Sequence, residues 1–134
     1  MWTTSIDFSK ARKLKEVTFR CGTTHIMWII SALRTITSEH EDLQQISIHI
    51  PYYPSYIADP ANIRGIVGEE VYRQWMDLDH LVVQFWESRT IRPKIMHLAA
   101  EKGLMVACIG VLLPEITKRG ISELVNLYEF HEFL

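Results

Sequence analysis

Two short segments of the chain share one apolar pattern, and this pattern constrains the fold more than any other feature. Residues 14–19 (LKEVTF) and 43–48 (LQQISI) both read apolar-x-x-apolar-x-apolar, and their starts are 29 residues apart. In each segment the last two apolar positions alternate with polar ones, which is typical of a strand with one buried face. The pattern therefore predicts two strands, over 13–21 and 43–50, that each keep one polar face.

The segment between these strands predicts a helix over about residues 25–40. Apolar residues recur there at spacings of three and four, which gives a helix one apolar stripe: Ile26, Ile29, Ile30, Leu33 and Ile36. A strand, a helix and a second strand form a unit with parallel strands and a right-handed crossover. The strand pattern and the spacing are those of a leucine-rich repeat at the long end of its usual length.

The rest of the chain continues the alternation of helices and strands. A short helix from Pro60 is expected to break near Gly68, and a longer helix over 69–88 carries a continuous apolar seam. Strands are expected over 91–98, with Pro93 early in the strand, and over 121–127. A helix over 101–118 is expected to be kinked by Pro114 and to end at Gly120.

These elements predict one α/β domain over residues 1–134. If every crossover advances in the same direction, the sheet is parallel, its order is 1-2-3-4, and all helices lie on one face. The alternative is a three-layer, doubly wound fold with helices on both faces, which buries both faces of each strand. The polar residues along the first two strands favour the one-sided arrangement.

A resemblance to a group of proteins is carried by four segments: IDFSKARKLKEVTF, LQQISIHI, GEEVYRQWMDLDHLVVQFWESRTIRPK and LLPEITKRG. These segments resemble uncharacterised fungal proteins with a degenerate leucine-rich-repeat-like region, in some cases behind an F-box. The resemblance implies a protein-interaction scaffold, and a chain that is a fragment or a short relative of a longer repeat protein. It provides no catalytic residues. The start of an F-box is mimicked by Leu113-Pro114-Glu115-Ile116, but only 18 residues follow, so we interpret it as the kinked helix.

Composition narrows the class of protein. The 134 residues include 14 basic and 16 acidic ones, a net charge of −2, which argues against a nucleic-acid-binding protein. The cations at Lys10, Arg12, Lys13 and Lys15 are interpreted as a solvated edge. The most apolar run, 104–113, has about half the length that spans a bilayer, so we expect no membrane segment and no membrane partner. Two distant cysteines, Cys21 and Cys108, suit reduced, buried thiols in the cytosol or nucleus, and we expect a cytoplasmic protein.

Candidate reactive groups are few, and we expect no metal and no cofactor. Asp77, Asp79 and His80 are potential ligands that we interpret as a solvated helix face. His40 is expected at a helix end, which favours a protonated imidazole. Cys21 and His25 have no obvious third catalytic partner. The loop with Tyr52, Tyr53 and Tyr56 is either a recognition element or folds over the end of the sheet.

We therefore predict a non-enzymatic scaffold that presents its polar strand face to a protein partner. The residues expected to form this face are Glu16, Thr18, Arg20, Gln45, Ser47 and His49. One alternative is a small α/β enzyme with a site at the carboxyl ends of the strands, around 21–25, 50–56 and 98–102. Another is a homo-oligomer that forms through open sheet edges.

Overall fold

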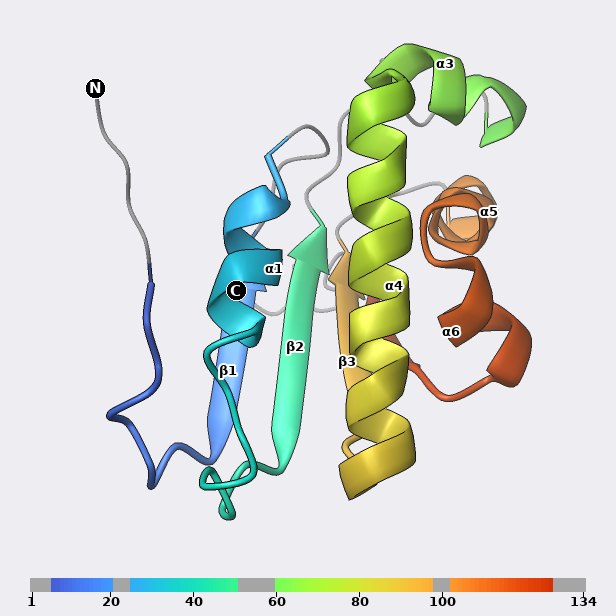
Figure 1. Cartoon of the computed structure of the whole chain (residues 1–134). Helices are drawn as coiled ribbons and strands as arrows, with labels where there is room; N and C mark the ends of the chain where they lie inside the picture. The colour runs from blue at the N-terminus through green and yellow to red at the C-terminus, as the bar shows by residue number, and fades with distance from the viewer. Residues whose placement is uncertain (1–5, 21–24, 51–59, 98–101, 127–134) are drawn as a thin grey trace, which may run out of the picture.

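The protein is a parallel sheet with its helices on one side (Figure 1). The computed structural model describes residues 6–20, 25–50, 60–97 and 102–126. The strands are β1 (Glu16–Arg20), β2 (Gln45–Ile50), β3 (Pro93–His97) and β4 (Glu123–Asn126). The helices are α1 (Met27–Leu33), the 3-10 turn η1 (Pro60–Asn62), α3 (Ile63–Val67), α4 (Glu69–Arg89), α5 (Lys102–Leu112) and α6 (Pro114–Arg119).

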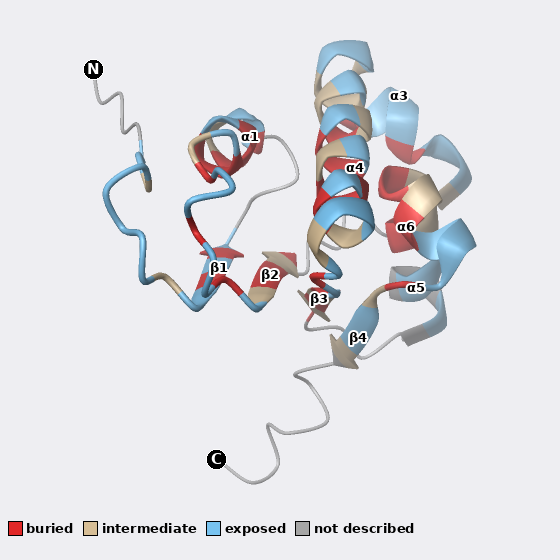
Figure 2. Ribbon diagram, turned by 60° about the horizontal axis from the view of Figure 1, so that its bottom comes forward, coloured by how far each residue is buried: buried red, intermediate tan, exposed pale blue. Residues whose placement is uncertain are grey.

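The sheet order is β1-β2-β3-β4 and every pair is parallel, so the predicted 1-2-3-4 order is confirmed. Helices α1 and α4 lie on the same face of the sheet, and α5 and α6 pack beside α4 (Figures 1 and 2). This is the arrangement that right-handed crossovers produce when each one advances the sheet in the same direction. The doubly wound alternative requires helices on both faces. In the described part of the chain, no helix lies on the face opposite α1 and α4.

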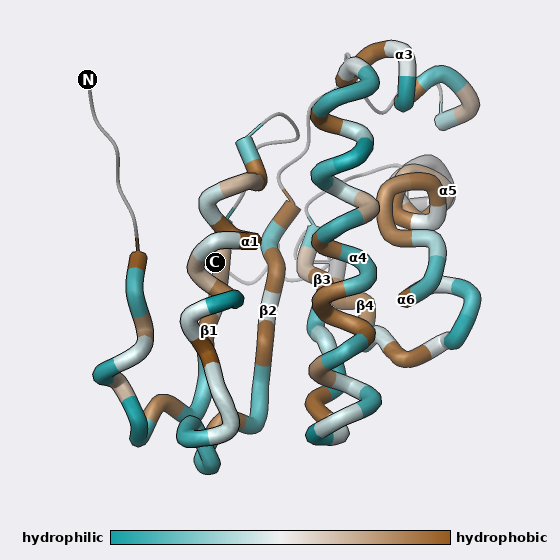
Figure 3. The backbone as a smooth tube through the Cα atoms, viewed as in Figure 1, coloured by the Kyte–Doolittle hydropathy of each residue, from teal (hydrophilic) through white to brown (hydrophobic). Residues whose placement is uncertain are grey.

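The twin apolar pattern lies in register across the sheet. Val17 is the neighbour of Ile46, and Phe19 is the neighbour of Ile48. All four side chains are buried beneath the helices, where Trp28 of α1 meets the ring of Phe19 edge-on at 5.6 Å between centroids. The pattern thus marks the face of each strand that joins the core. Apolar and polar residues alternate along β2 in Figure 3.

The first helix is shorter than the sequence predicts. It ends at Leu33 and not at His40, because threonine side chains beyond Leu33 bond to the backbone and favour turns. The Thr35 hydroxyl donates to the Ala32 carbonyl oxygen at 2.6 Å and accepts from the Phe8 amide at 2.8 Å. Residues 34–43 consequently form a series of turns that the N-terminal segment holds in place.

His40 lies within these turns, and the expectation of a protonated imidazole at a helix end is wrong. The side chain is fully buried. Its Nδ1 accepts from the Thr37 amide at 3.0 Å, and its Nε2 lies 2.6 Å from the Phe8 carbonyl oxygen. An amide can only donate and a carbonyl can only accept, so these bonds require the neutral ring with its proton on Nε2.

The later elements agree with the sequence patterns. Gly68 separates α3 from α4 with a φ of 93°, a conformation that suits a residue without a Cβ. Pro93 is the first residue of β3, where its missing amide hydrogen is tolerated. The helix expected to be kinked is two helices, α5 and α6, which meet at Leu113 with Pro114 in the first turn of α6.

Asp79 holds α6 against α4, and the interpretation of this residue as solvated is wrong. Its side chain is 1% exposed. Its two carboxylate oxygens accept from the Glu115 and Ile116 amides at 2.9 and 3.0 Å. Leu113, the residue that precedes α6, makes no side-chain cap bond, so Asp79 supplies the missing acceptor from another helix. Burial raises the pKa of Asp79, and the two amide donors oppose that rise.

We expect Asp79→Ala to lower the free energy of unfolding by about 1–3 kcal/mol, because two buried amides lose their acceptor. Asp77→Ala is the matched control, since Asp77 is exposed on the same helix. It should change stability by less than about 0.5 kcal/mol. Urea denaturation of both variants measures the difference, and equal stabilities would contradict the capping role of Asp79.

Candidate functional site on the polar face of the sheet

The sheet register places the six residues predicted for the polar face side by side. Glu16 neighbours Gln45, Thr18 neighbours Ser47, and Arg20 neighbours His49. Side chains alternate along a strand, so these pairs lie opposite the buried pairs that begin with Val17 and Phe19. The result is three short rows of polar groups on the face away from the helices.

The six residues differ in how much surface they offer. Glu16, Thr18 and Arg20 on β1 are exposed, and Gln45 and His49 on β2 are half-buried. Ser47 is 4% exposed. It is the smallest of the six and lies in one row between Thr18 and Lys94, so it forms the floor of the surface more than a contact point.

The same face continues over β3 and β4, onto residues that the sequence prediction did not include. The row of Ser47 extends to Lys94 and Glu123, and the row of His49 extends to Met96 and Val125. Lys94 and Glu123 are direct neighbours of opposite charge. Alternation within 91–98 and 121–127 marks these positions in the sequence, but Pro93 obscures the strand pattern there. The surface is therefore polar at β1 and partly apolar toward β4.

The electrostatics of the face are most distinctive where Arg20 and His49 meet. Burial lowers the pKa of His49, and the positive charge of Arg20 lowers it further. The ring of His49 is consequently neutral at pH 7, and Arg20 provides the cation at the carboxyl ends of β1 and β2. At the amino ends of β1 and β2 the charge is negative, because Glu16 lies there beside the neutral Gln45.

Other potential sites in the sequence do not come together as catalytic or metal centres. Among the described residues, no three His, Cys, Asp or Glu side chains are grouped closely enough to hold a metal ion. Asp77 and His80 are exposed on α4, whereas Asp79 caps α6. Cys108 is buried in α5, and burial raises the pKa of its thiol. That environment keeps the thiol protonated and unreactive.

The carboxyl edge of the sheet is where the alternative enzyme site was expected. Most of it lies outside the described residues, including Cys21, the aromatic loop with Tyr52, Tyr53 and Tyr56, and residues 98–101. The enzyme alternative therefore stays a prediction. The homo-oligomer alternative does as well, with β1 and β4 as the edge strands.

Comparison with known proteins adds no family to these observations: no family model, no curated protein and no solved structure matches the chain. Across the part of the chain that the structure describes, no helix has both the length and the apolar character needed to cross a bilayer.

NMR titration of the His49 ring tests the electrostatics of this face. We expect a pKa below the ordinary value of 6.5. Arg20→Ala should raise that pKa toward 6.5 without reaching it, because burial is the larger cause. Because the pKa of His49 is lowered in the folded state, the unfolded state binds more protons than the folded state. The free energy of unfolding that depends on His49 is therefore lost as the pH falls below about 6.5. Lys10→Ala removes a distant exposed cation and should leave the titration unchanged. An Arg20→Ala curve identical to that of the wild type would contradict the proximity of the two side chains.

Proposed function

We propose that this protein is a non-catalytic scaffold that binds a protein partner through the polar face of its parallel sheet. The observation that carries the proposal is the one-sided placement of the helices (Figure 2). All-parallel sheets almost always have both faces covered, so a face with exposed Glu16, Thr18 and Arg20 is unusual. Repeat proteins with such a sheet use this face for binding.

The chemistry of the face suits a polar partner surface. The exposed side chains of β1 carry both signs of charge, with Glu16 at the amino end and Arg20 at the carboxyl end. Charges in this arrangement select a partner with the opposite order and fix its orientation on the strands. The half-buried Met96 and Val125 add apolar area at the far side of the sheet. A mixed surface of this kind is typical of interfaces between proteins that also exist apart.

The proposal extends to the absence of catalysis and to a cytoplasmic location. The buried, protonated thiol of Cys108 and the neutral, bonded ring of His40 support a structural role for both groups. The location is supported by the small number of cysteines and the burial of Cys108, which suit a reducing compartment.

A double charge reversal, Glu16→Lys with Arg20→Glu, tests the proposed interface. We expect capture of the partner to fall by at least about tenfold, the equivalent of about 1.4 kcal/mol, because both charges then repel their counterparts. Quantitative mass spectrometry of proteins captured by the wild-type and variant chains gives the comparison.

The matched control reverses two exposed charges on the helical side, Glu70→Lys with Lys118→Glu. A partner that binds the sheet face is retained by this control and lost with the sheet-face variant. If the sheet-face variant captures the same proteins at the same level as the wild type, the proposed interface is wrong.

A further inference from the structure

The N-terminal segment over residues 6–14 covers the end of the apolar core beside β1 and α1 (Figure 1). The ring of Phe8 meets the ring of Phe19 edge-on, with 6.2 Å between their centroids. Leu14 packs against the same core. We call residues 6–14 the strap, since they lie over Phe19, which is only 2% exposed.

Two side chains from the turns after α1 bind the backbone of Phe8 in the strap. The Thr35 hydroxyl accepts from the Phe8 amide at 2.8 Å, and the Nε2 of His40 donates to the Phe8 carbonyl oxygen at 2.6 Å. The other ring nitrogen of His40, Nδ1, accepts from the Thr37 amide at 3.0 Å. The imidazole therefore joins the strap to the turns, and it does so with both of its nitrogens.

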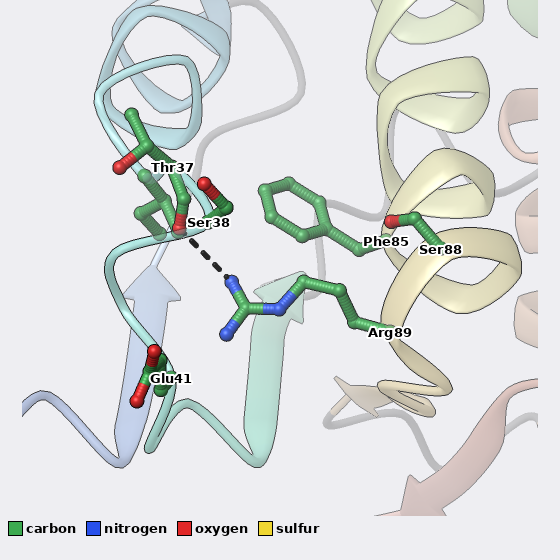
Figure 4. A pocket seen from close by; sticks show the side chains of 7 residues that line it. Thr37, Ser38, Glu41, Phe85, Ser88 and Arg89 are labelled. Atoms are coloured by element: carbon green, nitrogen blue, oxygen red, sulfur yellow. Dashed lines mark hydrogen bonds between the residues drawn. The ribbon is translucent and has the colours of Figure 1, made fainter.

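The turns that carry His40 are also fastened to α4. Figure 4 shows Arg89 reaching from α4 to these turns, where its guanidinium donates to the Thr37 carbonyl oxygen at 3.3 Å and to the His40 carbonyl oxygen. These two bonds hold the residues on which the imidazole depends. The position of the ring is consequently fixed both from the strap and from the layer of helices.

Among the described residues, no carboxylate forms an ion pair with the His40 ring. The charged residues of the surrounding segments are Asp7, Lys10, Arg12 and Lys13 of the strap, Arg34, Glu39, Glu41 and Asp42 of the turns, and Arg89 of α4. Every carboxylate in this set is exposed to water. Arg12 pairs with Glu39 at 3.2 Å, and the Asp7 carboxylate accepts from the Ser9 amide. The half-buried Arg89, bonded to the His40 carbonyl, repels a second positive charge.

Protonation of the His40 ring is incompatible with this set of bonds. A protonated imidazole carries a hydrogen on each nitrogen, so Nδ1 can no longer accept from the Thr37 amide. Two donors would then face each other at a side chain that is fully buried, and a buried donor without an acceptor is costly. Water offers an acceptor to both donors once the ring has left its site. The Phe8 carbonyl loses its imidazole donor in the same movement.

We propose that His40 is an acid-sensitive latch, which holds the strap over the core while its ring is neutral and releases the strap when its ring is protonated. Release uncovers the side of Phe19 against which Phe8 packs, and this creates an apolar surface next to the exposed side chains of β1. The latch is independent of the proposed binding at the sheet face, because it rests on the contacts of Phe8, Thr37 and His40 alone.

Hydrogen exchange of the Phe8 and Thr37 amides, followed by NMR at pH 7.5 and 5.5, tests the latch. An imidazole in water takes up its proton near pH 6.5, so a state with a free ring gains about tenfold over the latched state between these two pH values. We therefore expect the protection factors of both amides, corrected for intrinsic exchange, to fall by about tenfold at pH 5.5.

His40→Gln should keep both amides protected to the same extent at the two pH values, because a side-chain amide can accept from Thr37 and donate to Phe8 but does not titrate. His49→Gln is the matched control, since it removes another histidine outside the latch, and it should lose protection as the wild type does. Thermal melts verify that each variant is folded.

The ¹⁵N shifts of the His40 ring in the wild type provide a second measurement that needs no variant. The ring should carry its proton on Nε2 at pH 7.5, and its protonated fraction should rise together with the exchange of the Phe8 amide. Equal wild-type protection at both pH values would overturn the proposal. So would a loss of protection that survives in His40→Gln or disappears in His49→Gln, or a protonated His40 ring with the Phe8 amide still protected.

Discussion

A row of buried apolar side chains runs across the sheet and joins it to the layer of helices. The rest of the structure depends on this row. Phe19, Ile48 and Ile95 are register neighbours on β1, β2 and β3, and each is at most 2% exposed. Burial of a side chain of this size contributes about 1.5–3 kcal/mol. Because side chains alternate along a strand, fixing this row beneath the helices fixes the intervening residues on the opposite face. The polar surface is therefore a direct consequence of how the core is built.

The unequal lengths of the helices produce the second feature of the molecule. Helix α4 is long enough to cover the sheet from end to end, whereas α1 is replaced after Leu33 by turns that His40 and Arg89 hold. The layer of helices thus has a groove between the turns after α1 and the end of α4. The opposite face of the sheet carries charged side chains. Both surfaces arise from the packing of helices of unequal length on one face of the sheet.

Much of the fold could be predicted from the sequence, because apolar residues recur at regular spacings over long segments and align between the strands. The twin pattern at Leu14 and Leu43 indicated the one-sided sheet, and the seam of α4 indicated its boundaries within one residue. The end of α1 was missed because Ile36 continues the helical spacing, although the hydroxyl of Thr35 competes for the backbone. Asp79 was also missed. Two features indicate the buried capping role of Asp79. Asp79 lies four residues after the buried Trp75, and α6 begins without a capping side chain of its own.

The most direct test of the account is the accessibility of the face away from the helices, measured by maleimide labelling of single cysteines under native conditions. The variants are Thr18→Cys, Lys94→Cys and the buried control Val17→Cys, in a chain whose Cys21 is replaced by serine. We expect labelling of Thr18→Cys at a rate close to that of the unfolded chain, and slower but clear labelling of Lys94→Cys, because Lys94 is half-buried. Val17→Cys, on the helix side of the same strand as Thr18, should be protected. Equal protection at Thr18, Lys94 and Val17 would show that the sheet is covered on both faces, and it would contradict the proposed binding surface.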